Sequence, residues 1–172
     1  EIRQGILAGR ILAYDLASFT WPGWGEEGIE IGPRELEAGM KAARLNLELA
    51  KRLKKPPDKM SAAYWVLGAH LLAAGEHEGA MKAFLDAKEH AAEAGNRFSM
   101  RLQDGYLGLA LLCRGDRETG EKALRQAIAA LEAAESEDGA FFAEQLRTAH
   151  RVFVGDEGEG TRNIRCGPLA LR

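Results

Sequence analysis

A pattern of small and large apolar residues that occurs twice, 40 residues apart, constrains the fold more than any other feature of the chain. The first copy lies within Ser61–Ala94. In each copy, two amphipathic segments with helical periodicity flank a glycine, which predicts two antiparallel helices joined by a tight turn. The matching positions are Leu67, Gly68, Leu71, Gly75, Ala80, Phe84 and Ala87 in the first copy, and Leu107, Gly108, Leu111, Gly115, Gly120, Leu124 and Ala127 in the second.

The small residues have a direct packing role, because two helices cross closely only where each presents a small side chain. We expect Gly68 to face Ala80, and Gly108 to face Gly120. A large residue such as Phe84 then fills the space between one helix pair and the next. One pair cannot bury its apolar face alone, so the pattern predicts a stack of helix pairs.

The first copy resembles a tetratricopeptide repeat, and residues 101–134 resemble a second one. Tyr64 stands where the family often has tryptophan, and Asp104 takes that position in the second copy. The family repeat is about 34 residues long, so the longer period here implies longer helices. The resemblance covers residues 59–135, with a looser relative in the N-terminal helix pair. It implies a right-handed superhelix, an α-solenoid, in which the first helix of each pair lines a concave groove that binds peptides.

We expect a single all-α domain of about seven helices over residues 1–153. A polar, glycine-rich linker and tail follow at 154–172, and no segment shows the alternation of a β-strand. The helices are expected as pairs over 1–54, 58–94 and 97–135, with a capping helix at 139–153.

The loop at residues 20–32 interrupts the first pair and is rich in large apolar side chains. It contains Trp21, Trp24, Ile29 and Ile31. Burying one such side chain stabilises a protein by about 1.5–3 kcal/mol. We therefore expect this loop to pack down on the helices.

The family resemblance also places a set of apolar side chains on the concave face. Chaperone-binding members of the family hold a terminal carboxylate with Lys, Arg and Asn at such positions. None of these residue types occurs at the expected groove positions of this chain. The sequence therefore predicts an apolar or mixed partner segment and not a carboxylate clamp. The expected concave-face residues are Trp65, Ala69, Leu72, Leu102, Leu109 and Leu112.

An apolar groove needs a cover, because a large exposed apolar patch marks an interface or promotes aggregation. The sequence leaves three covers open. The loop at 21–31 or the tail at 164–171 folds into the groove, a second copy of the chain supplies the same surface, or an apolar partner peptide occupies it.

Charge and composition exclude several classes of protein. A formal net charge of −3 gives no electrostatic footprint for nucleic acid. No apolar run approaches the roughly 20 residues of a membrane span. Two cysteines this far apart, Cys113 and Cys166, do not make the framework of a disulfide-rich secreted fold. We expect thiols at both positions and a cytoplasmic location.

No motif indicates catalysis, a cofactor or a bound metal ion. The leading hypothesis is a non-catalytic interaction module that binds a protein or peptide partner in the concave groove. The alternative is a self-associating homodimer, formed through the groove or through the helix at 139–153, where Phe141 and Phe142 are adjacent. A third hypothesis is a small-molecule sensor or enzyme that uses a pocket near His70, beside Trp65.

Overall fold

The computed structural model describes residues 2–155, and these form an all-α protein. Within that range no strand occurs and seven α-helices pack against their neighbours, which confirms the predicted fold class. The predicted linker and tail at 154–172 lie almost wholly outside the described residues. The elements are α1 (Ile2–Phe19), the short 3-10 helix η1 (Pro22–Trp24), α2 (Pro33–Arg52), α3 (Pro57–Ala73), α4 (His77–Glu93), α5 (Arg97–Arg114), α6 (Arg117–Glu132) and α7 (Glu137–Phe153).

The helix boundaries follow from the local sequence. Pro33 and Pro57 occupy the first turn of α2 and α3, where a missing N–H leaves no intrahelical hydrogen bond unmade. The side chain of Asn96 caps α5 by accepting a hydrogen bond from the backbone N–H of Ser99. At the other end of α5, Gly115 stops the helix in the left-handed region, with φ of 102°.

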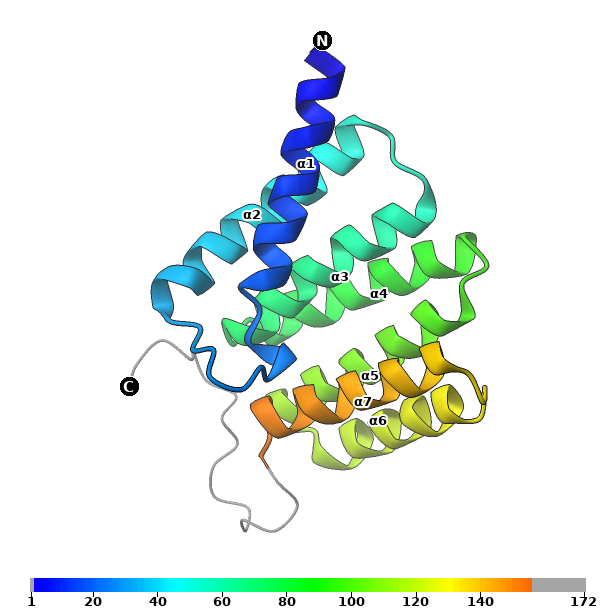
Figure 1. Ribbon diagram of the computed structural model, residues 1–172. Coiled ribbons are helices and arrows are strands. Elements are labelled where there is room, and N and C mark those ends of the chain that lie inside the picture. The colour runs from blue at the N-terminus through cyan, green and yellow to red at the C-terminus, as the bar shows by residue number, and fades with distance from the viewer. Residues whose placement is uncertain (1, 156–172) are drawn as a thin grey trace.

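The helices are arranged as antiparallel pairs that stack on one another (Figure 1). Helix α3 pairs with α4, α5 pairs with α6, and the two pairs meet between α4 and α5. Helix α7 closes the stack against α5 and α6, whereas α1 packs mainly on α2 at the opposite end. Figure 1 shows α1 running steeply across the later helices, with its N-terminal turns projecting from the body of the protein.

The two repeat copies pack tightly at their small residues. A Cβ atom on Gly68 would lie 2.7 Å from the ring of Phe84, so this ring can rest on α3 only because position 68 is glycine. In the second pair the two backbones meet, since a Cβ atom on Gly108 would lie 2.9 Å from the carbonyl oxygen of Gly120. Phe84 then joins the pairs, because its ring stacks on that of Tyr106 in α5 with 5.2 Å between centroids.

The remaining repeat positions fit the same scheme. Gly75 and Gly115 lie at the ends of α3 and α5 in the left-handed region, which favours glycine. Leu67 and Leu107 are half-buried against the core. The buried positions are Ala80, Ala87, Leu124 and Ala127.

A tryptophan from the loop after α1 occupies the centre of the core. Trp21 is 1% exposed. Its ring centroid lies 5.6 Å from that of Trp65 in α3 and 5.7 Å from that of Tyr106 in α5, both edge-on. The ring of Phe153 in α7 lies 6.3 Å away. One side chain therefore contacts three helices that are far apart in the sequence.

Candidate functional site

The six residues predicted to line a concave groove lie in one core cluster, but none of them lines an open surface. Trp21 packs against Trp65, and the ring of Trp24 lies 5.9 Å from Trp65 as well. The chain's own loop, one of the three covers left open by the sequence, therefore covers this face at Trp65, whereas α7 packs on α5. The buried residues are Trp65, Ala69, Leu72, Leu102, Leu109 and Leu112.

His70 is a packed residue at the junction of three helices. Its side chain is buried, and its Nε2–H donates a hydrogen bond to the carbonyl oxygen of Ala17, 2.7 Å away. Burial lowers the pKa of His70, and the hydrogen bond to Ala17 only partly offsets this effect. A Cβ atom on Gly39 of α2 would lie 2.3 Å from the His70 ring, so α2 also approaches closely here. His70 does not line the pocket that the structure contains beside the loop.

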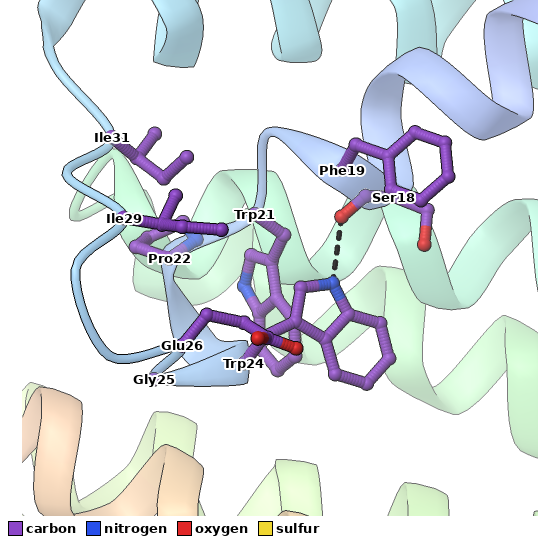
Figure 2. Close-up of a pocket in the computed structure, with 9 residues that line it drawn as sticks. All are labelled: Ser18, Phe19, Trp21, Pro22, Trp24, Gly25, Glu26, Ile29 and Ile31. Carbon is purple, nitrogen blue, oxygen red and sulfur yellow. Dashed lines mark hydrogen bonds between the residues drawn. The ribbon is translucent and has the colours of Figure 1, made fainter.

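The loop at residues 20–32, named the Trp loop here, is fixed to the helices on either side of it. The Nε1–H of Trp24 donates a hydrogen bond to the carbonyl oxygen of Ser18, 2.7 Å away (Figure 2). Gly25 adopts φ of 61°, and a Cβ atom there would lie 2.7 Å from Cγ2 of Thr148 in α7. The Trp loop thus connects the end of α1 with α7.

A pocket of about 430 Å³ opens beside the Trp loop (Figure 2). Figure 2 shows the rings of Trp21 and Trp24 next to each other, with Pro22 and Ile29 on the Trp21 side and Phe19 on the Trp24 side. Most of the lining side chains are apolar, and among them Glu26 alone carries a charge. The pocket is therefore suited to an apolar group that enters from solvent. Its lining is Ser18, Phe19, Trp21, Pro22, Trp24, Gly25, Glu26, Ile29 and Ile31.

The side of α1 that faces away from α2 is also apolar, and it is exposed. Helix α1 turns Ala13 and Ala17 into the core. Another side of α1 presents residues spaced by three and four positions, which share one helix face. We name this surface the outer face of α1, and its exposed members are Gly5, Ala8, Leu12, Leu16 and Phe19.

The five residues that define the outer face are uncharged. The exposed side chain of Asp15 borders them, since it lies three positions after Leu12 and four before Phe19. Arg10 turns toward α2, where it donates a hydrogen bond to the side chain of Asn46. The later helices carry ion pairs at their surface, such as that between Lys88 and Asp104. Because Phe19 belongs to both the outer face and the pocket lining, the two form one continuous apolar surface.

The remaining chemistry of the described chain is limited. Residues 2–155 contain no group of three or more His, Cys, Asp or Glu side chains placed to hold a metal ion. Among the described helices, none combines the length and the apolar character needed to cross a membrane. Cys113 is disulfide-bonded, so the thiol predicted at that position is wrong. Cys166 lies outside the described residues.

Comparison with models of protein families, with curated proteins and with solved structures gives no match to this chain. Its function is therefore inferred from the geometry of the outer face and the pocket.

Proposed function

We propose that the chain is a non-catalytic interaction module, and that it binds an apolar helix or peptide segment across the outer face of α1 and the Trp-loop pocket. The supporting observation is the continuous exposed apolar surface that runs from Leu12 through Phe19 to Ile29. Scattered apolar side chains are normal at a protein surface, but a continuous patch marks a contact site.

The shape of this surface suits a helical partner. Leu12, Leu16 and Phe19 follow the spacing by which an amphipathic helix presents its anchor side chains. Toward the N-terminus, Gly5 and Ala8 leave room for the backbone of a partner, and nothing lies within 4 Å of a Cβ atom built on Gly5. Helices that pack in this way approach to about 8–10 Å between axes.

The resemblance to tetratricopeptide repeats would place the partner in the concave groove instead. Such a partner would have to displace Trp21, which is packed among Trp65, Tyr106 and Phe153. Removing a buried side chain of this size costs about 3–5 kcal/mol. The outer face needs no such displacement, so we place the contact surface there. The proposal assigns no catalytic role to His70, which is engaged with Ala17.

A designed peptide that imitates an apolar partner helix tests this function. The probe is a fluorescein-labelled amphipathic helix of leucine, alanine and lysine, titrated with protein and followed by anisotropy. We expect Leu12→Ser to weaken binding by about tenfold or more, as for a central contact residue. Leu85→Ser on α4 is the matched control, since Leu85 is an exposed leucine that belongs neither to the outer face of α1 nor to the pocket lining.

Hydrogen exchange then locates the site. Protection by the peptide is expected in α1 and the Trp loop. Equal affinity of Leu12→Ser and wild type, or protection confined to other helices, would show that the outer face is not the contact surface.

A further inference from the structure

We propose that the partner of this surface is a second copy of the same chain, packed through α1 in antiparallel orientation about a two-fold axis at Leu12. This inference rests on the proposed function, because it names the occupant of the same contact surface.

The outer face is complementary to itself in size. Phe19 lies seven residues after Leu12, and Gly5 lies seven residues before it. Leu16 lies four residues after Leu12, and Ala8 lies four before it. A two-fold axis that reverses the helix therefore places each large side chain opposite a small one. A parallel pair would set Phe19 against Phe19 and leave a gap between the two Gly5 residues.

The pocket continues this complementarity beyond the helix end. Ile2 lies ten residues before Leu12, and Pro22 lies ten residues after it. Because α1 ends at Phe19, Ile2 of one copy therefore lies just beyond the end of the other copy's α1, where the Trp loop begins. Pro22 lines the apolar pocket of about 430 Å³. Ile2 is 81% exposed in the single chain, so it is available to enter that pocket.

The area that this arrangement buries is large enough for a specific dimer. Exposed fractions along the surface are 81% for Ile2, 69% for Leu12, 47% for Leu16, 77% for Phe19 and 60% for Ile29. Together they equal somewhat more than three fully exposed large side chains, or roughly 600 Å² per copy at ~180 Å² each. Complete burial of these five side chains in both copies would remove roughly 1,200 Å² in total, which reaches the lower limit of stable, specific interfaces.

Charge also favours this occupant. The five residues of the outer face are uncharged and Asp15 alone borders them with a charge beside Leu12 and Phe19, so the occupant must offer a largely uncharged surface. The chain itself carries one. Helix α7, the other candidate for self-association, exposes a single large apolar side chain among its described residues, Phe141.

Sedimentation velocity of the full chain, from low micromolar to near-millimolar concentration, tests the dimer. We expect a reversible dimer with a dissociation constant of about 10⁻⁶–10⁻⁴ M, as suits a small interface. Leu12→Glu should raise this constant by more than tenfold, because it places two charges at the symmetry axis. Leu85→Glu, at an exposed leucine away from α1, should leave it unchanged. Circular dichroism and the urea midpoint verify that each variant is folded.

A size exchange tests the antiparallel register. Gly5→Phe alone and Phe19→Ala alone should each weaken the dimer. The double variant should recover much of the loss, because it recreates one large and one small residue in the reversed order. Absence of this recovery would overturn the register.

The two proposals fail in different ways. A monomer at all concentrations whose peptide binding is still lost in Leu12→Ser would overturn the dimer and keep the interaction surface. A dimer that survives Leu12→Glu would overturn the inference by placing the interface elsewhere. A protein that is monomeric at every concentration, and that binds the peptide equally well as wild type and as Leu12→Ser, would overturn both proposals.

Discussion

The Nε2–H of His70 lies 2.7 Å from the carbonyl oxygen of Ala17 and donates a hydrogen bond to it. This contact joins the last turn of α3 to the last turn of α1, across 53 residues of sequence. Since the carbonyl oxygen accepts, the proton of the neutral ring sits on Nε2. The tautomer of His70 is therefore set by the position of α1.

The buried state of His70 predicts a loss of stability in mild acid. Burial lowers its pKa from the ordinary value of 6.5, so between pH 6.5 and the lower folded-state pKa the unfolded chain binds more protons than the folded one. The free energy of unfolding should therefore fall as pH decreases below about 6.5. Urea unfolding at pH 7.5, 6.5, 5.5 and 5.0 measures the effect.

His70→Gln is the control for this prediction, because its amide N–H can still donate to Ala17 but does not titrate. The difference between the two pH profiles isolates His70, since the lowered pKa of His77 contributes to both. Parallel profiles for wild type and His70→Gln would contradict the assignment.

Trp21 is expected to be the most costly single truncation in the Trp loop. Trp21→Ala removes a fully buried ring that contacts α3, α5 and α7. We expect a loss of about 3–5 kcal/mol in the free energy of unfolding. Phe141→Ala, which truncates an exposed ring on α7, should change it by about 0.5 kcal/mol or less.

If Trp21→Ala does not fold, Trp21→Phe supplies the measurement, with a smaller but clear loss. Similar stabilities for Trp21→Phe and wild type would show that the cluster tolerates a smaller ring.

Two helical glycines should respond in opposite directions to alanine. In Gly39→Ala the new Cβ would lie 2.1 Å from Oγ1 of Thr20 and 2.3 Å from the His70 ring, so α1 or α3 must shift. We expect a loss of about 1–3 kcal/mol, as for other overpacked cores. In Gly79→Ala the nearest atom is 3.5 Å away, on Leu71, and the higher helix propensity of alanine should add up to about 1 kcal/mol. Thermal unfolding of both variants gives the comparison.

The two repeat glycines should differ in whether a second substitution rescues them. The three atoms nearest to a Cβ on Gly68 would all belong to the ring of Phe84, so Gly68→Ala combined with Phe84→Leu should recover part of the lost stability. A Cβ on Gly108 would lie 2.8 Å from the backbone nitrogen of Leu124, which no side-chain change can move. Leu124→Ala should therefore fail to rescue Gly108→Ala. A double-mutant cycle by urea unfolding measures each coupling.

The helix pairs could be predicted from the sequence because their signals are local and repeated. The small residue Gly68 and the large residue Phe84 correspond to Gly108 and Leu124 in the second copy. Such a pattern depends only on which residues face each other within one helix pair. Helix ends were equally readable, since Pro33 begins α2 where a proline is tolerated. These features need no information about distant parts of the chain.

The candidate site could not be predicted in the same way. The sequence indicates that the Trp loop packs on the helices, but not that Trp21 is buried while Ile29 stays exposed. That division depends on where α7 ends, more than 100 residues later. The outer face of α1 was missed because periodicity identifies an apolar side of a helix without saying whether a neighbour covers it. The adjacent pair Ile11 and Leu12 could have indicated this face. Two neighbouring apolar residues make the apolar side of α1 wider than the surface that one packed helix covers.

The position of Trp21 also affects how the array comes apart. In a linear array each repeat contacts only its neighbours, so an end can melt while the rest persists. Here one indole contacts Trp65 in α3 and Phe153 in α7. Opening of α7 would therefore expose the centre of the protein, and loss of the Trp loop would loosen α3 and α7 together. The chain should consequently unfold in a single cooperative transition, although its helices are built from separate repeats.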